Sequence, residues 1–262
     1  MVKLVNTAIR IKPRKNPKSM ISLQSELIKK KLSVPEFKQK YDSLERRVLV
    51  NDGTPQAYTT TRRYEDYNTI LTRCFPENKI FKDSILHTLL DYARTTKKET
   101  IKALDDGAGM GKFLFELKNR WNDIKDATQI NTNLETTAIS LTPNKVVVPG
   151  IDHIIYGNVA KFEPSQKYDF IFSVYGGFHY SVPVLRKEIL LKYVYSLNKG
   201  GSAIFGFNFN DIYAENFRSQ EIITALKKRG FYAEYKFTPH KVVPNNSSYD
   251  LPYSYLLVKR LK

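Results

Sequence analysis

Apolar and polar residues alternate in blocks through the last two thirds of the chain, and one stretch organises the pattern. Residues 101–117, IKALDDGAGMGKFLFEL, begin with an apolar run, continue through three glycines, and end in a new apolar series. The first run predicts a strand and the second a helix, because its apolar residues recur at helical spacing. The residues on that helix face are Phe113, Leu114, Leu117 and Trp121.

Downstream of this stretch, strand-like and helix-like segments follow one another. Such alternation favours an α/β fold with a doubly wound, mostly parallel sheet and helices on both faces. Tyr168–Val174, YDFIFSV, is apolar enough for a central buried strand. The other predicted segments are a short second strand at Asp126–Asn131, extended segments at Lys145–Pro149 and around Ile154, a helix at Val184–Leu197, a strand at Ala203–Asn208, a helix at Ala214–Arg229, and a closing antiparallel pair at Phe231–Phe237 and Tyr253–Leu261.

The first part of the chain has a different character. Residues 19–47 predict two helices separated near Pro35, and residues 62–75 predict another helix. A helix over Lys82–Thr95 then leads into the first strand. We therefore divide the chain into a basic, mostly helical N-terminal extension or cap, 1–80, and a sheet-containing domain, 81–262.

Charge is concentrated ahead of the glycine turn. The 262 residues carry a formal charge of +16, and residues 1–100 contain 21 Lys/Arg against 11 Asp/Glu. Residues 1–25 contain six Lys/Arg and no acidic residue. This charge indicates either a nucleic-acid or other acidic partner at the N-terminus, or solubility alone.

The cysteine content and the hydropathy of the sequence indicate where in the cell the protein is expected. Cys74 is the single cysteine, so no internal disulfide can form, which fits a reducing compartment. The sequence contains no run of 18 apolar residues, so we expect no membrane span and a cytoplasmic protein.

The glycine turn itself indicates a ligand. Gly107, Gly109 and Gly111 let backbone approach a ligand closely, at the N-terminus of a helix. A dinucleotide site requires G-x-G-x-x-G, whereas here Lys112 occupies the position of the third glycine. The turn also begins with Asp105 and Asp106, whose carboxylates would repel a pyrophosphate and suit a cationic ligand.

These residues resemble a known family. Asp105-Asp106-Gly107-Ala108-Gly109-Met110-Gly111 is similar to motif I of the class I, Rossmann-like S-adenosylmethionine-dependent methyltransferases. The Tyr168–Ser173 strand and the Leu197–Gly201 turn, LNKGG, resemble that family's fourth strand and the turn before its fifth. The resemblance covers roughly residues 80–262 and implies a seven-stranded sheet and S-adenosyl-L-methionine as cofactor.

The resemblance also implies which residues bind the cofactor. It places Asn131 where the family has an acid that holds the ribose hydroxyls, and Asn158 where an acid often contacts the adenine amine. An amide can form both kinds of hydrogen bond but brings no charge. The implied cofactor residues are Asp105, Asp106, Gly107, Ala108, Gly109, Gly111, Asn131, Asn158, Val159, Ser173 and Val174.

Methyl transfer is an in-line displacement at the sulfonium carbon, so the protein mainly aligns and desolvates the acceptor. His179, in the loop after the fourth strand, is the candidate base, since its ordinary pKa lies near neutrality. Tyr175 and Tyr180 are candidates for contacting the acceptor. His87, His153 and His240 have no metal-ligand spacing, so we predict no metal.

The sequence thus predicts a transferase acting on a small-molecule acceptor, because the loop text SVYGGFHY resembles small-molecule methyltransferases. Two alternatives stay open. One is a methyltransferase that acts on RNA or protein through the basic N-terminus. The other is a non-catalytic protein with the same fold, suggested by the replacement of two acids by Asn131 and Asn158.

Overall fold

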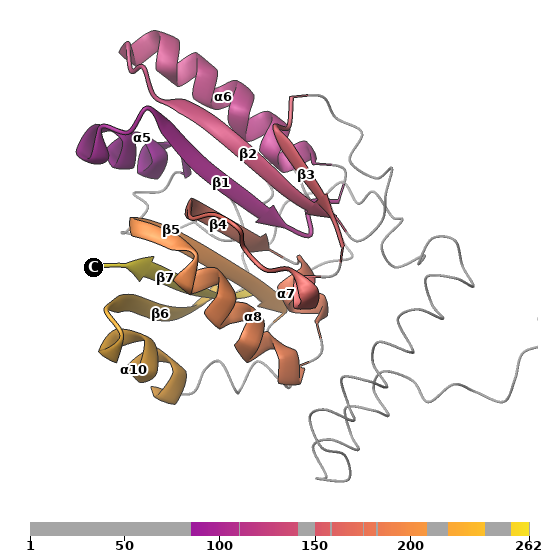
Figure 1. Cartoon of the computed structure of the whole chain (residues 1–262). Coiled ribbons are helices and arrows are strands. Elements are labelled where there is room, and N and C mark those ends of the chain that lie inside the picture. Colours follow the sequence, from indigo (N-terminus) through magenta and orange to yellow (C-terminus); the bar gives the residue numbers. More distant parts are fainter. Residues whose placement is uncertain are drawn as a thin grey trace, which may run out of the picture. The chain divides into compact units, whose positions relative to one another are not determined.

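The computed structural model describes residues 85–109, 111–140, 150–157, 159–174, 176–181, 183–208, 220–238 and 253–261. Their strands form one sheet in the order β3-β2-β1-β4-β5-β7-β6 (Figure 1). All neighbours are parallel except β7, which runs antiparallel to both β5 and β6. The strands are β1 (Thr100–Asp106), β2 (Asn133–Ser140), β3 (His153–Tyr156), β4 (Tyr168–Val174), β5 (Leu197–Asn208), β6 (Phe231–Thr238) and β7 (Tyr253–Arg260).

The order of the strands creates a switch point beside β1. From β1 the chain moves outward to β2 and β3 on one side, then returns to place β4 and β5 on the other. In doubly wound sheets, ligands bind outside the carboxyl ends of the strands where the order reverses. Here that place is the edge where β1 and β4 end.

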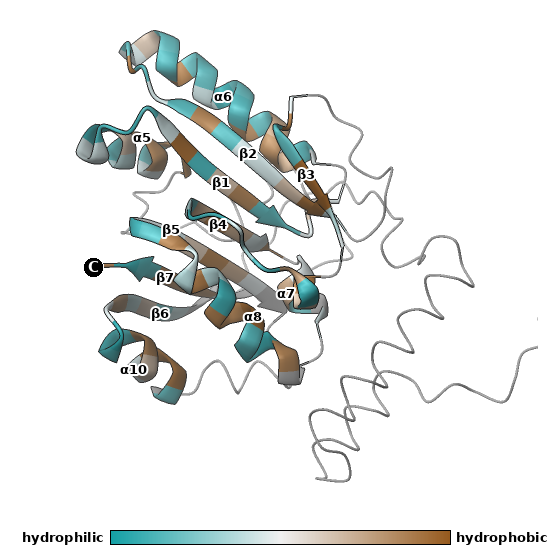
Figure 2. Cartoon of the chain, viewed as in Figure 1, coloured by the Kyte–Doolittle hydropathy of each residue, from teal (hydrophilic) through white to brown (hydrophobic). Residues whose placement is uncertain are grey.

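Helices pack on both faces of the sheet. Helix α5 (Ile85–Thr96) and α6 (Lys112–Thr128) share one hydrophobic cluster with alternate residues of β1 and β4. The predicted helix face of α6 is entirely buried, and Figure 2 shows hydrophilic residues along much of its outer side. Helices α7 (Gly177–Tyr180) and α8 (Pro183–Tyr195) contribute to the other face, where Phe178 and Tyr193 pack on Phe205. The remaining elements are the 3-10 turn η1 (Val159–Lys161) and helix α10 (Gln220–Lys228).

A buried carboxylate fixes the opposite, amino edge of the sheet. Asp169, at the start of β4, accepts hydrogen bonds from the Tyr92 hydroxyl at 2.6 Å and the Lys102 amide at 2.8 Å. The Asn198 side-chain amide donates at 2.8 Å, and Lys98 forms an ion pair at 2.5 Å. These four donors connect α5, β1 and β5 to β4, so the switch-point strands hold a fixed register.

The predicted α/β architecture is confirmed, including the Tyr168–Val174 strand and the closing antiparallel pair. The predicted second strand is wrong. Residues 126–128 belong to α6, and β2 begins only at Asn133. The reason is that the apolar series of α6 continues past Trp121 to the half-buried Ile124, so the helix runs a further turn.

Several predictions fall outside the described residues. These are the helices within 19–47 and 62–75, the Lys145–Pro149 segment, and the boundary between 1–80 and 81–262. Within the described ranges, no helix is long and apolar enough to cross a membrane.

Candidate functional site

The glycine loop lies at the carboxyl end of β1 and adopts the backbone that its sequence predicts. Gly107, Gly109 and Gly111 have φ values of 84°, 52° and 80°, in the left-handed region that favours glycine. The amides of Gly107 and Ala108 both donate to the carbonyl of Ile139, at 3.1 and 3.0 Å. The loop is therefore tied to the end of β2, and those two amides are not available to cradle a phosphate.

A second glycine pair meets this loop. Gly176 and Gly177 follow β4, and a Cβ on Gly107 would lie 2.5 Å from the Gly176 Cα. A Cβ on Gly176 would overlap the carbonyl oxygen of Asp106. The turns after β1 and β4 thus pack backbone against backbone, an approach that only glycine permits. The signal in the sequence was two consecutive glycines directly after a buried strand.

The two acids that precede the loop lie on opposite faces of the sheet, because successive side chains of a strand alternate. Asp105 is on the α6 side, where its strand neighbours are Ala138 and Phe172, and it is 6% exposed. Asp106 is on the α8 side and has no exposed surface. Of these two acids, therefore, only Asp105 has exposed surface that a ligand at this edge could contact.

Asp106 is held by polar groups on two elements. Its Oδ2 accepts the Ser173 hydroxyl at 2.8 Å and the Phe178 amide at 3.0 Å. Burial raises the pKa of Asp106 to about 6, although these two bonds, the Tyr193 hydroxyl and the Gly177 amide lower it. Ser173 is itself completely buried, so its hydroxyl serves Asp106.

The short helix α7 carries the candidate base. His179 is partly buried, and its Nδ1 atom lies in the interior. The buried Arg186 of α8 donates from Nη2 to the His179 carbonyl at 2.5 Å and from Nε to the Ser181 carbonyl at 3.0 Å. Sequence reasoning missed Arg186, although an arginine within the apolar stretch PVLRKEILL was a signal of a buried cation with a partner.

Most predicted site residues that the structure describes gather at this edge. Val159 is buried, and its side chain lies where a Cβ on Gly177 would be, so η1 also reaches the turn after β4. Val174 ends β4 and is partly buried. The residues brought together are Asp105, Asp106, Gly107, Ala108, Gly109, Gly111, Val159, Ser173, Val174 and His179. Asn158, Tyr175 and the side chain of Tyr180 lie outside the described residues.

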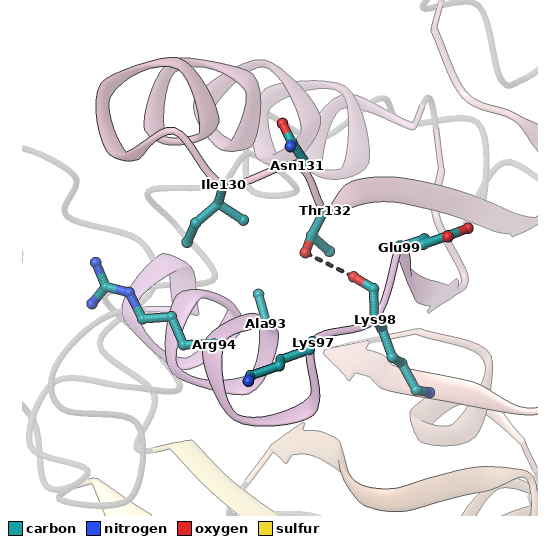
Figure 3. Close-up of a pocket in the computed structure, with 8 residues that line it drawn as sticks. All are labelled: Ala93, Arg94, Lys97, Lys98, Glu99, Ile130, Asn131 and Thr132. Carbon is teal, nitrogen blue, oxygen red and sulfur yellow. Dashed lines mark hydrogen bonds between the residues drawn. The ribbon is translucent and has the colours of Figure 1, made fainter.

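Asn131 is not part of this group. It precedes β2, at the amino edge of the sheet, so the prediction that it holds a cofactor ribose at the end of the second strand is wrong. It lines a pocket of about 300 Å³ between α5 and the α6–β2 loop (Figure 3). There the Thr132 hydroxyl donates to the Lys98 carbonyl at 2.8 Å. The cause is the longer α6, which moves residue 131 from the end of β2 to its beginning.

The comparisons with known proteins concern the fold. No family model and no curated protein matches the sequence. The structure is similar to the plantazolicin methyltransferase BpumL, solved with a desmethylPZN analogue and SAH, at 14% identity over 85% of this chain and 98% of that one, with a TM-score of 0.49. It is also similar to the N-methyltransferase NodS from Bradyrhizobium japonicum, at 14% identity over 71% and 99% of the two chains, with a TM-score of 0.44. A third similar structure is an rRNA methylase from Streptococcus thermophilus, at 13% identity over 68% and 98%, with a TM-score of 0.45.

The sheet itself defines the class of fold. A first strand followed by a glycine turn, a switch point beside it and a closing antiparallel pair make this the class I methyltransferase fold. The similarities above, at such low identity, say nothing about which molecules this chain binds.

Proposed function

We propose that this chain is an S-adenosylmethionine-dependent methyltransferase that acts on a small-molecule acceptor. The observation that carries the proposal is the glycine loop at the switch point, with Asp105 two residues before its first glycine. Three left-handed glycines leave no side chain between the backbone and a ligand at this edge. Asp105 adds a negative charge near the place where the ammonium and sulfonium of the cofactor would be held.

The hydrogen bonding of the loop favours this cofactor over a phosphorylated one. Pyrophosphate sites use the backbone amides of a glycine turn as donors. Here the amides of Gly107 and Ala108 donate to the Ile139 carbonyl, and Asp105 places a carboxylate at the end of the same strand. A cationic nucleoside needs neither amide and gains from the carboxylate.

The charge and hydrogen bonding of the glycine loop and Asp105 fit a cationic cofactor, and the residues of the site then have the following expected roles. When bound, the cofactor supplies an electrophilic methyl group. The glycine loop and Asp105 would hold it, and Val159 and Val174 would give apolar contact beside the turn after β4. His179 would accept the proton of the acceptor, with Tyr175 and Tyr180 as further candidates for contacting it. Removing His179 by His179→Ala should lower turnover, and undiminished turnover would eliminate it as the base.

Calorimetry tests the cofactor assignment. We expect S-adenosylmethionine and its demethylated product to bind, while NAD and ATP give no heat. Asp105→Asn should weaken S-adenosylmethionine binding at least tenfold, since it removes one charge without changing shape. Asp123→Asn, which removes an exposed charge from the far part of α6, is the matched control and should bind as the unaltered protein does.

A variant of the loop supplies a second test. Gly109→Val introduces a β-branched side chain at φ 52°, and should abolish cofactor binding while circular dichroism shows a folded domain. Binding of ATP or NAD in place of S-adenosylmethionine, or unchanged affinity in both variants, would refute the assignment.

The charge of the chain supports one alternative acceptor class. The excess of Lys/Arg in residues 1–100 would attract RNA or an acidic protein. Retention on heparin that is lost on deleting residues 1–25 would favour this alternative over a small molecule. A protein that binds the cofactor but transfers no methyl group to any acceptor class would correspond to the non-catalytic alternative.

A further inference from the structure

Asp106 occupies a position from which it cannot contact a ligand in this structure. It has no exposed surface, and Oδ2 is fully engaged by the Ser173 hydroxyl and the Phe178 amide. On the Oδ1 side, a Cβ added to Gly177 would lie 2.5 Å from that oxygen, so backbone approaches it directly. The carboxylate is therefore enclosed by the turn that follows β4.

Arg186 holds the same turn from its other end. Phe178, whose amide is bound by Asp106, belongs to the first turn of α7, whereas the carbonyls of His179 and Ser181 are bound by Arg186. Within the turn, the Ser181 amide and hydroxyl both reach the Gly177 carbonyl, at 2.9 and 2.6 Å. A helix of four residues has little stability of its own, so these charged groups determine where it lies.

The two charged groups would be costly without this use. An ionised side chain is buried at low cost only when it is paired or fully hydrogen-bonded. Asp106 and Arg186 are 0% and 5% exposed. Both bind backbone groups of the turn, and Asp106 also accepts the Ser173 hydroxyl. Losing either set of bonds would leave a buried charge unsatisfied, so the turn and the charges stabilise one another.

We propose that Asp106 is a positioning residue and not a cofactor ligand: with Arg186, it fixes α7 and thereby places His179 beside the glycine loop. We call these bonds of Asp106 and Arg186 to residues 178–181 the clamp. The clamp itself follows from the contacts above, and only the catalytic role of His179 rests on the proposed function.

The surroundings of Asp106 make the clamp sensitive to pH. Oδ1 has no well-aligned hydrogen bond to a described residue, and neither has the Tyr193 hydroxyl of α8. The two groups still interact, because burial first and then the Asp106 charge raise the pKa of Tyr193 well above its ordinary value. Tyr168 and Asp105 are the other titratable groups acting on Tyr193. Protonating Asp106 weakens its charge-assisted bond to the Phe178 amide, and with a pKa of about 6 this occurs near neutral pH.

The first experiment uses nuclear magnetic resonance on the full chain without ligand. We expect the Phe178 amide signal to titrate with an apparent pKa near 6, because its acceptor changes there from a carboxylate to a neutral carboxyl group. In Asp106→Asn the titration should disappear while the fold is retained, because the amide side chain still accepts from Ser173 and Phe178. Asp169→Asn, which neutralises an equally buried carboxylate at the opposite edge of the sheet, should leave the titration unchanged. A Phe178 amide signal that neither titrates in the unaltered protein nor shifts in Asp106→Asn would overturn the clamp.

The second experiment separates positioning from cofactor binding. Affinity for S-adenosylmethionine should stay within about threefold in Asp106→Asn and fall at least tenfold in Asp105→Asn. Equal losses in the two variants would make Asp106 a cofactor ligand and overturn the proposal. If the unaltered protein binds no S-adenosylmethionine, the proposed function fails, whereas the resonance experiment still decides whether Asp106 holds the turn.

Discussion

Neutralising Asp106 should change how the stability of the protein depends on pH. The folded protein holds a proton on Asp106 more tightly than the unfolded chain does, because the pKa rises from 3.8 to about 6 on folding. The stabilisation from this group is therefore fully present below pH 3.8 and is lost as the pH rises through 6. Asp106→Asn has no such group, so its stability relative to the unaltered protein should increase with pH.

The size of the effect follows from the same two values. A shift of this size corresponds to about 3 kcal/mol over the whole titration, at about 1.4 kcal/mol per unit. Integrated between pH 4 and pH 7.5, the linkage gives about 2 kcal/mol. The Asp106 charge also raises the pKa of Tyr193, but that hydroxyl titrates well above this pH range and does not affect the difference.

Urea unfolding at a series of pH values measures this difference. The free energy of unfolding of Asp106→Asn minus that of the unaltered protein should rise by about 2 kcal/mol from pH 4 to pH 7.5. Asp123→Asn, which removes one exposed carboxylate, is the matched control. A flat difference for Asp106→Asn would show that its carboxyl titrates normally, and a falling one would show that its charged form is stabilised in the folded state.

Two further predictions concern contacts away from the titrating group. Gly176→Ala should destabilise the protein by about 2 kcal/mol or more, because its Cβ would overlap a backbone carbonyl. Gly150→Ala, at φ 86° and with only an ordinary contact to the Phe115 ring at 3.9 Å, should cost about 1 kcal/mol for its backbone conformation. Equal losses in urea unfolding would contradict the close packing at Gly176. Lys98→Met should lower the free energy of unfolding by about 2 kcal/mol or more, because it removes the cation that pairs with the buried Asp169. Lys112→Met breaks a surface ion pair and should lower it by less than about 0.5 kcal/mol. Similar melting temperatures for the two variants would contradict the role of Lys98.

Local sequence patterns predicted the parts of the fold whose signals are short and strong. The glycine turn after β1 and the apolar run of β4 are each sequence patterns that fit a single local structure, and both were predicted correctly. The end of α6 was misplaced because its last turns, Asn122–Thr128, are mostly polar and partly exposed. Without a clear apolar period, this polar helix end was interpreted as a short strand, and the same error put Asn131 at the wrong edge.

The sequence predicted where the site lies more accurately than it predicted what each residue of the site does. Alternation along β1 could have placed Asp105 and Asp106 on different faces, since neighbouring strand residues always point apart. By contrast, no local pattern indicates that Arg186 binds the carbonyl of His179, because that contact depends on how α8 packs against the turn. The role of a residue such as Arg186, which depends on packing between helices and turns, can be recognised only in the structure.

The position of β7 has a consequence for the newly made chain. β7 follows both β5 and β6 along the chain, yet it lies between them and pairs with each. Until residues 253–260 emerge, the edge of β5 that pairs with β7 lacks this partner strand, and an unpaired strand edge can associate with other chains. Synthesis therefore passes through an interval in which this edge of the sheet is open to aggregation.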